Sequence, residues 1–566
     1  MRDTTTDMVK KNDGLIIRGT GACAEQLIRQ MEAFDKGWLL NVLCFVDYNP
    51  KKQGMTFYDK PVISDADIDW TRRNLLYVVA IGNSELVAQE IQARSFFIRG
   101  VNLFTYREYL GLFYRNKLKK NEPIKSLLEW EQSNKGWNEL LRICHKYGTA
   151  EIVMWLYRLF QGKFEEIMPI IEQSGFPDPF RRDVKVVGLY IYSYGGGGAE
   201  RVVSLLIPNL CSAGYKVVLI TQVKNEVNEY ALPKGVIRVV ISPKMTSNPK
   251  EYFTQWREII KVHKLDALCM HIPYEGEVFF LTALFAKLSG LRVIAENHTS
   301  CINFVRQRGG LRGHDKMYRI LDGLVVLSRM DELFWGAFGC RTCYIPNPCP
   351  VLPYKITSQS EKLGKTIIWV GRRDQQYKRI CDTGLILREV LKKISDARLM
   401  IVGDKANDAD DAHFFSLLQR EGLESHIEIC GWQKDVGKFY GMADVMLFTS
   451  PGEGFPMVLA EAMQHALPIV MYELPYLELV RSGRGVIPVR QGDIRGAAKA
   501  LAEVLYDAEK RNRLSIEALE NIREFERWDI DASWKDVLEN GGRQPTKQDT
   551  VLLPMLLREM SNWQND

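Results

Sequence analysis

Short apolar runs alternate with longer segments of helical periodicity along most of the chain. The runs are rich in valine, isoleucine and leucine, whereas the segments between them place apolar residues three or four positions apart. This alternation is typical of parallel sheets whose strands are joined by helices. Glycine, proline and polar stretches divide the pattern into three blocks. The whole pattern predicts an α/β protein. In it, a small Rossmann-like domain and a helical linker region come first, and two doubly wound Rossmann-like domains follow them.

The first block predicts the small Rossmann-like domain over residues 1–115. The elements expected in it are strands at residues 15–18, up to 47 and at 77–81, and a helix that ends at Met31. A mainly helical pattern then runs over residues 122–173, and a polar, proline-bearing segment follows at 174–183. We therefore expect a helical linker region over residues 116–183.

The second and third blocks predict the two doubly wound domains, at residues 184–350 and 351–540. The strands expected in them lie at residues 184–192, 217–221, 237–241, 267–271, 292–296, 324–327, 366–370, 398–402, 427–430, 445–448 and 468–472. The helices expected in the third block lie at residues 381–394, 413–421, 435–442, 455–465 and 493–505. The proline-rich segment 344–350 separates the blocks, because closely spaced prolines exclude regular structure. Ligands in such folds bind beyond the carboxyl ends of strands, so we expect a site between these domains.

The amino-acid composition and charge limit the classes of function that the protein could have. The sequence is 46% hydrophobic and 26% charged, which is average for globular proteins. A chain of 566 residues is too long to fold around a single hydrophobic core. The chain has 75 lysine and arginine residues and 70 aspartate and glutamate residues, which gives a net charge of +5. This charge is too small to predict nucleic-acid binding. The first residues are polar, and no uninterrupted apolar stretch approaches the roughly 20 residues of a membrane span. We therefore expect a cytoplasmic protein.

The segment from Ser450 to Met463 carries the sharpest motif, since a strand there runs into a glycine-bearing loop and then an apolar helix. Glu453 and Glu461 stand at the two ends of this segment. At a rise of 1.5 Å per residue they lie on the order of 10 to 12 Å apart, so they can reach both ends of an extended ligand. The helix N-terminus between them can hold a phosphate. The plainer interpretation is a helix-dipole partner at Glu453 and a solvated Glu461.

Three further motifs stand at strand ends. Four glycines, 195–198, follow a strand and precede a helix, which lets backbone N–H groups approach an anionic ligand. Arg372 ends another strand, and Lys378 follows it by six residues; both side chains suit phosphate oxygens. His298 also follows a strand. Taken singly, these residues also fit a flexible turn, solvated cations and a structural histidine.

Together these motifs resemble those of retaining GT-B glycosyltransferases of glycosyltransferase family 4, over about residues 184–540. Glu453 to Glu461 is similar to the E-x7-E motif of the family, with Gly454 and Phe455 inside it. The Gly371-Arg372 pair followed by Lys378 is similar to the family's diphosphate-binding pair.

The glycine loop at Gly197 and Gly198 and the strand-end His298 are also similar to family features. The resemblance implies that residues 184–350 form an acceptor domain and residues 351–540 a donor domain. It also implies that the segment 541–566 is a C-terminal helix that packs back on the acceptor domain.

The resemblance implies a role for each of these residues. Glu461 would bind the donor ribose and Glu453 the sugar hydroxyls, while Arg372 and Lys378 would bind the diphosphate. His298 would lie near the reacting carbon. His298, Glu453, Arg372 and Lys378 are therefore the expected catalytic residues. Gly197, Gly198, Gly454, Phe455 and Glu461 complete the expected donor site.

The implied activity is the metal-independent, retaining transfer of a sugar from a nucleoside diphosphate sugar, with UDP expected. The acceptor would be a glycan or a lipid-linked glycan in bacterial surface polysaccharide or glycoconjugate synthesis, and transfer would need no cofactor. We interpret residues 408–411, Asp-Ala-Asp-Asp, as a solvated loop rather than a metal site. The chain departs from the family at Arg373, where an apolar residue is usual, and at Arg379, where glycine is usual. The alternatives are a catalytically silent sugar-nucleotide sensor and a sugar-nucleotide epimerase.

The N-terminal domain carries a second fingerprint. Gly19 and Gly21 follow its first strand, and Asp47 ends its second, as in dinucleotide-binding domains. This domain resembles the nucleotide-binding domain of bacterial sugar acyltransferases, which implies a bound nucleotide. The alternative is a domain that serves docking or oligomerisation. The sequence leaves the oligomeric state open.

Two basic segments could face an anionic membrane surface. Arg115 to Lys120 adjoins a group of apolar residues, and Arg306 to Arg312 follows the His298 loop. Such clusters attract anionic headgroups or a lipid-linked diphosphate. They predict peripheral association at the inner face of the membrane, whereas the plainer interpretation is a pair of solvated surfaces.

Overall fold

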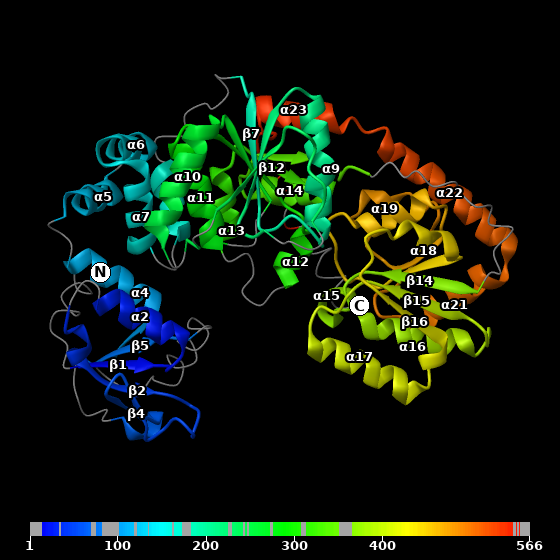
Figure 1. Ribbon diagram of the computed structural model, residues 1–566, viewed down its shortest axis with the longest axis horizontal. Coiled ribbons are helices and arrows are strands. Elements are labelled where there is room, and N and C mark those ends of the chain that lie inside the picture. The colour runs from blue at the N-terminus through cyan, green and yellow to red at the C-terminus, as the bar shows by residue number, and fades with distance from the viewer. Residues whose placement is uncertain are drawn as a thin grey trace. The chain divides into compact units, whose positions relative to one another are not determined.

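The computed structural model describes residues 14–32, 36–68, 75–81, 101–117, 121–133, 135–160, 164–172, 183–224, 229–241, 244–245, 248–271, 276–306, 313–349, 365–546, 549, 551 and 554 (Figure 1). The chain divides into two compact units. The first comprises Met1–Pro177 with Pro249–Thr254 and Phe280–Leu288, and the second comprises Asp178–Asn248, Gln255–Phe279 and Ser289–Asp566. None of the helices in these described ranges is long and apolar enough to cross a membrane.

The first unit opens with a six-stranded sheet in the order β3-β4-β2-β1-β5-β6. Its strands are β1 (Gly14–Arg18), β2 (Val42–Val46), β3 (Thr56–Phe57), β4 (Lys60–Ile63), β5 (Leu75–Val79) and β6 (Val101–Thr105). The central strand β1 pairs in parallel with β2 and β5, as in the small Rossmann-like domain that the sequence predicts here. The helices α2 (Ala22–Glu32) and α4 (Tyr106–Lys117) lie beside this sheet in Figure 1.

Short helices follow within the same unit, where the sequence pattern predicted a helical region. They are α5 (Glu122–Gln132), α6 (Gly136–Tyr147), α7 (Thr149–Leu159) and α8 (Ile167–Ile171). Their buried faces carry large apolar side chains such as Trp130, Trp137 and Leu156. The predicted linker 174–183 lies outside the described residues except for Asp183.

The first doubly wound domain holds a seven-stranded parallel sheet in the order β13-β12-β11-β10-β7-β8-β9. Its strands are β7 (Val186–Ile191), β8 (Lys216–Thr221), β9 (Ile237–Val240), β10 (Ala267–Met270), β11 (Arg292–Glu296), β12 (Gly323–Val326) and β13 (Thr342–Tyr344). Its helices are α9 (Gly198–Ser212), α10 (Pro249–His263), α11 (Gly276–Leu288), α12 (Cys301–Arg306), α13 (His314–Met317) and α14 (Arg329–Ala337). Placing Tyr344 in an irregular connector was wrong, because the prolines begin only at Pro346 and β13 can pair with β12 before them.

The second doubly wound domain holds a six-stranded sheet in the order β16-β15-β14-β17-β18-β19. Its strands are β14 (Thr366–Val370), β15 (Arg398–Val402), β16 (Ile427–Gly431), β17 (Val445–Phe448), β18 (Ile469–Tyr472) and β19 (Val486–Val489). Its helices are α15 (Gln375–Lys378), α16 (Ile380–Leu391), α17 (Asp408–Glu421), α18 (Gly437–Met442), α19 (Met457–Gln464), α20 (Glu478–Arg481), α21 (Ile494–Tyr506) and α22 (Ala508–Glu526). Figure 1 shows α16 and α17 on one face of the sheet and α18 and α19 on the other. The sequence pattern missed β19, an edge strand whose Pro488 is tolerated at that position.

Residues 408–411 are not the solvated loop that we expected, since they form the first turn of α17. The Asn407 side chain caps this helix by accepting a hydrogen bond from the Asp410 backbone N–H at 2.8 Å. Acidic side chains are favourable at a helix N-terminus, because the exposed N–H groups carry partial positive charge there. The acidic run therefore begins a helix.

The chain returns to the first doubly wound domain with α23 (Ile530–Asn540). Trp534, Val537 and Leu538 lie in the same buried apolar cluster as the β7 side chains Val187 and Leu189. After the helix, the Gly542 N–H donates to the Asp322 carbonyl oxygen at 2.9 Å. The contact with this domain thus begins before residue 541, and most residues beyond 546 lie outside the described part of the chain.

Replacing Trp534 tests how much α23 contributes to this domain. Trp534 is 2% exposed, so Trp534→Ala should lower the free energy of unfolding of the second unit by about 3–5 kcal/mol. Tyr506→Ala is the matched control, because Tyr506 is 89% exposed and its loss should cost less than about 0.5 kcal/mol. Thermal unfolding followed by circular dichroism compares the two variants. Equal shifts would contradict a stabilising role for the returning helix.

Candidate functional site

The predicted site residues stand at the carboxyl ends of parallel strands in the two doubly wound domains. His298 follows β11, Arg372 follows β14 and Glu453 follows β17. The loops of the two domains meet at Gly454, where an added Cβ atom would lie 2.6 Å from the carbonyl oxygen of His298. Only a glycine leaves room for this approach of two backbones. Glu453 is therefore held next to the strand end that carries His298.

Lys378 and Glu453 form an ion pair in which both side chains are partly buried. The loops around them are fixed: the Thr449 hydroxyl donates to the Lys378 carbonyl oxygen at 2.7 Å, and the Glu453 backbone N–H donates to the Tyr476 hydroxyl at 2.8 Å. The structure thus brings together the residue expected at the diphosphate and the residue expected at the sugar. The Tyr476 contact was not predicted from sequence.

Glu461 lies on α19 with its carboxylate turned toward the protein interior. It accepts a hydrogen bond from the Tyr440 hydroxyl at 3.1 Å. Burial raises the pKa of the Glu461 carboxyl, while the Tyr440 hydroxyl and the positive charge of Arg201 oppose this rise. Because α19 begins only at Met457, Glu453 lies in the loop before the helix and not at its first turn.

The glycine loop runs directly into α9, as expected from sequence. Gly198 is the first helical residue and Gly197 precedes it in an extended conformation. The Glu200 carboxylate folds back over this loop, so that a Cβ atom on Gly197 would overlap it, and it accepts a hydrogen bond from the Ser193 hydroxyl at 3.1 Å. The Arg201 guanidinium lies 5.6 Å from the centre of the Tyr230 ring. The first turn of α9 therefore holds charged side chains next to the glycine backbone.

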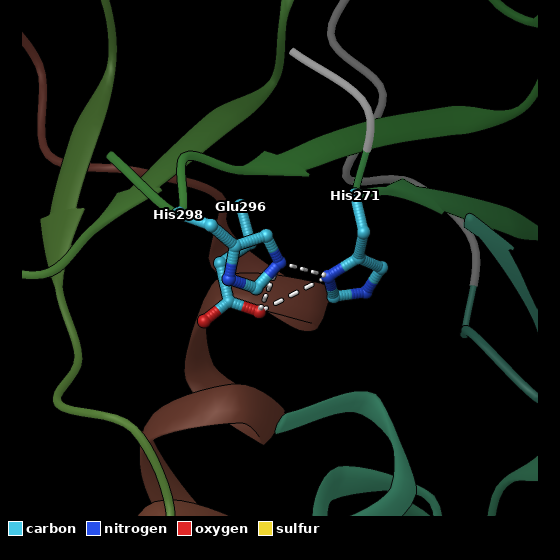
Figure 2. A group of neighbouring side chains, drawn as sticks. All are labelled: His271, Glu296 and His298. Carbon is cyan, nitrogen blue, oxygen red and sulfur yellow. Dashed lines mark hydrogen bonds and ion pairs between the residues drawn. The ribbon is translucent and has the colours of Figure 1, made fainter. Parts of the chain in front are cut away.

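His298 belongs to a buried cluster with His271 and Glu296 (Figure 2). His271 Nδ1 lies 3.1 Å from His298 Nε2 and 3.1 Å from Glu296 Oε2, and the latter atom lies 3.8 Å from His298 Nε2. Burial lowers the pKa of His298 to about 4, although the Glu296 carboxylate opposes this. Burial alone would raise the pKa of Glu296, but the facing imidazoles of His298 and His271 bring it below its usual value. The cluster thus combines an anionic carboxylate with a neutral His298.

Sequence reasoning missed His271 and Glu296. Both were visible as polar residues at the ends of apolar strands, β10 and β11, which pair in parallel. The parallel register brings such strand ends to one edge of the sheet, which is the signal that could have found them. Ligand-type atoms of all three side chains lie within 4.8 Å of one another, a spacing that a metal ion could bridge.

The structure explains the family departure at Arg373, and at Arg379 it shows a conformation that favours the family's usual glycine. Arg373 is buried, with its Nε atom 2.6 Å from Asp411 Oδ1 and its Nη1 atom 2.8 Å from the Gly403 carbonyl oxygen. Arg373 therefore anchors the first turn of α17 to the β14 loop. Arg379 has a φ of 49° between α15 and α16, a left-handed conformation that costs a non-glycine residue roughly 1–2 kcal/mol.

Arg372, unlike its neighbour, has an exposed side chain. Within the described part of the chain, its guanidinium has no hydrogen-bond partner or ion-pair partner. The two adjacent arginines thus have opposite environments, with Arg373 tied into the fold and Arg372 open to a ligand.

The N-terminal fingerprint residues also meet at one sheet edge. Gly19 has a φ of 110°, and a Cβ atom on it would lie 2.5 Å from the Ala80 carbonyl oxygen. Gly21 begins the turn into α2, and its carbonyl oxygen accepts a hydrogen bond from the Ala24 N–H at 3.0 Å.

Asp47 already has partners on this edge. Burial acts to raise the pKa of the Asp47 carboxyl, but the Thr20 hydroxyl, the Asn49 N–H and Lys52 lower it. Asp47 accepts hydrogen bonds from all three of these groups. A nucleotide at this edge stays a prediction.

The first basic segment is partly neutralised within its own unit. Arg115 forms an ion pair with Glu131, and its guanidinium also donates to the Leu159 carbonyl oxygen at 3.4 Å. Residues 118–120 of this segment and residues 307–312 of the second lie outside the described ranges. Association of these segments with a membrane surface stays a prediction.

Comparison with known proteins gives the class to which this arrangement belongs. The family described as Glycosyltransferase Family 4 matches residues 196–350, and the family described as Glycosyl transferases group 1 matches residues 364–507. The phosphatidyl-myo-inositol mannosyltransferase of Mycobacterium leprae is 31% identical over 360 residues, covering 60% of this chain and 91% of that protein. The chain belongs to glycosyltransferase family 4.

Two more distant proteins agree with this placement. The N-acetylgalactosamine-N,N'-diacetylbacillosaminyl-diphospho-undecaprenol 4-alpha-N-acetylgalactosaminyltransferase of Campylobacter jejuni is 25% identical over 309 residues, covering 50% of this chain and 80% of that protein. The crystal structure of Anabaena Alr3699/HepE in complex with UDP and glucose matches with a TM-score of 0.52 at 16% identity, covering 63% of this chain and 99% of that one. The two doubly wound domains therefore form a GT-B glycosyltransferase fold.

The Gly454 contact predicts a sharp local effect. Gly454→Ala should separate the Glu453 loop from the His298 strand end, because the added Cβ atom meets backbone that cannot move cheaply. We expect the kcat/KM of sugar transfer to fall at least about tenfold while the circular dichroism spectrum stays that of the parent. Gly441→Ala is the matched control, since this helical glycine has open space around it. Equal activity of the two variants would show that the close approach is not needed.

Proposed function

We propose that the protein transfers a sugar from a nucleoside diphosphate sugar, with UDP as the nucleotide, with retention of the anomeric configuration and without a metal ion. The acceptor we propose is a glycan or a lipid-linked glycan in the assembly of a bacterial surface polysaccharide or glycoconjugate. The observation that carries the proposal is the Lys378–Glu453 pair, held by Gly454 against the strand end of His298. The lipid-linked acceptor named for the Campylobacter relative and the UDP bound by the Anabaena protein support it.

The cationic side chains would bind the departing diphosphate. Arg372 offers an exposed planar fork for two phosphate oxygens, and Lys378 offers a point charge. Both stabilise the negative charge that develops on the leaving group, which is the task that a metal ion performs in other transferases. Binding of the diphosphate to Lys378 would release Glu453, whose carboxylate could then accept hydrogen bonds from sugar hydroxyls.

The remaining groups would place the nucleoside and the sugar. Glu461 would accept hydrogen bonds from the donor ribose, with Tyr440 fixing the orientation of its carboxylate. The backbone N–H groups at Gly197 and Gly198 begin α9 and would approach the donor phosphate. His298 is neutral near pH 7, so it would hydrogen-bond the transferring sugar without adding a full charge.

Nucleotide release from a donor panel tests the proposal. Parent protein is incubated with UDP, GDP, ADP and CMP sugars, with and without lipid-linked acceptors, and in the presence of EDTA. We expect release of UDP that depends on acceptor, persists in EDTA and gives a product with the anomeric configuration of the donor by NMR. Glu461→Ala should abolish it.

Other results of this assay would favour the competing functions. Donor-dependent thermal stabilisation with no turnover would favour a silent sugar-nucleotide sensor. Release of an isomerised sugar without an acceptor would favour an epimerase. Activity that EDTA abolishes and a divalent ion restores would overturn the metal-independent part alone.

Removing Arg372 gives a quantitative test of the diphosphate site. A charge-assisted hydrogen bond contributes about 1.5–3 kcal/mol, so Arg372→Ala should lower kcat/KM for the donor on the order of tenfold or more. Arg398→Ala is the matched control, because Arg398 is also exposed but stands at the amino end of β15, the opposite edge of the sheet. Unchanged turnover and donor affinity in Arg372→Ala would overturn this assignment.

A further inference from the structure

The shared nitrogen in the buried cluster is His271 Nδ1. It lies 3.1 Å from an oxygen of Glu296 on one side and 3.1 Å from Nε2 of His298 on the other (Figure 2). The two imidazole rings are inclined by only 24° with their centroids 5.3 Å apart. With the nitrogens closer together than the ring centres, the rings lie edge to edge and the two nitrogens face each other. This geometry suits an N–H···N hydrogen bond.

The carboxylate decides which nitrogen carries the proton. If His298 Nε2 donated, His271 Nδ1 would present a lone pair to the anionic Glu296 oxygen at the same short distance, and the two would repel in a buried site of low dielectric. If His271 Nδ1 carries the proton, it donates to His298 Nε2, and its partial positive charge lies 3.1 Å from the Glu296 oxygen, which makes that contact attractive. His298 Nε2 is then an acceptor, and its remaining proton belongs on Nδ1.

The three side chains of the cluster differ in their exposure to solvent. The side chains of His271 and Glu296 are 0% and 2% exposed, whereas His298 is 12% exposed. The Trp534 ring of α23 lies 6.4 Å from the His271 ring. His298 is therefore the member that a ligand can reach, and the other two are enclosed by the fold.

We propose that His271 and Glu296 are positioning residues that hold His298 in the Nδ1–H tautomer, so that it presents one hydrogen-bond donor to the transferring sugar. The inference rests on the proposed function for the role of His298, and it adds two residues to that function. The transfer itself moves no proton through this chain of side chains. The fixed tautomer makes His298 a donor at a defined atom in every turnover.

A metal ion is the competing occupant of this cluster. The three side chains are close enough to ligate one, but an ion requires the lone pairs of both imidazoles to converge on it. Two ring nitrogens that face each other have their lone pairs aimed along the line between them. The arrangement therefore favours the hydrogen-bonded interpretation, and the metal content of the purified full-length chain is an arm of the test.

Two substitutions of His271 separate positioning from packing. In His271→Asn the amide nitrogen takes the place of Nδ1 and can still donate to Glu296 and His298. His271→Leu fills similar space with no donor. We expect kcat of donor turnover to fall about 100-fold in the leucine variant, as for loss of one oriented hydrogen-bond donor to the transition state, with the KM for donor changed little. The asparagine variant should recover at least tenfold of that loss.

The histidine tautomer provides a readout that does not depend on activity. Full-length protein labelled with ¹⁵N-histidine is compared at pH 7 with the two variants, and the His298 signals are assigned from their loss in His298→Asn. We expect a protonated Nδ1 and an unprotonated Nε2 in the parent and in His271→Asn, and a mixture of tautomers in His271→Leu. A parent with this tautomer but no turnover would sink the proposed function and leave the positioning inference standing.

Three results would overturn the inference. His298 protonated at Nε2 in the parent would reverse the direction of the hydrogen bond. Equal kcat in the asparagine and leucine variants would reduce His271 to a packing residue. A stoichiometric metal ion in the purified parent that is lost in Glu296→Gln would assign the cluster to a metal.

Discussion

The backbone contact at Gly454 is the constraint on which the site depends. Any side chain at this position would overlap the His298 carbonyl oxygen, so the glycine alone lets two loops from separate sheets touch. Tyr476 fixes the same loop by hydrogen-bonding to both the N–H and the carbonyl oxygen of Glu453. Groups that are far apart in sequence therefore share one site through backbone proximity. A site built in this way needs no long side chain to reach across, which keeps the loss of side-chain entropy small.

Charges in and around this site are compensated in pairs. Lys378 faces Glu453, Arg373 faces Asp411, and Glu296 faces two imidazoles. Burying any one of these groups alone would be costly, since an isolated charge loses its hydration. Arg372 is exposed and differs from them in this respect. A diphosphate that bound Arg372 and Lys378 would exchange one partner of Lys378 for another, and a sugar hydroxyl could replace the lysine at Glu453. One ligand would thereby satisfy both members of the pair.

Sequence patterns predicted the fold well where elements are long and regular. The central strands and the parallel order follow from apolar runs separated by helical segments, because a parallel strand buried on both faces leaves a continuous apolar signature. The short edge strands β13 and β19 have weaker signatures, and one of them contains a proline. The acidic turn 408–411 was misassigned because its partner Arg373 is 38 residues away from Asp411. Strand-end positions of Glu453, Arg372 and His298 could be predicted, while His271 and Glu296 become a cluster only when the register of β10 and β11 is known.

The returning helix α23 connects the stability of the fold with the geometry of the site. Its Trp534 packs in the apolar cluster of the first doubly wound domain and also lies next to the ring of His271. The carboxylate of Glu296 is buried, and its pKa lies below the usual value because the imidazoles of His298 and His271 face it. Enclosure by protein strengthens that electrostatic contact, since the local dielectric is low. A segment that enters the domain from the far end of the chain thus helps to fix which nitrogen of His298 carries its proton.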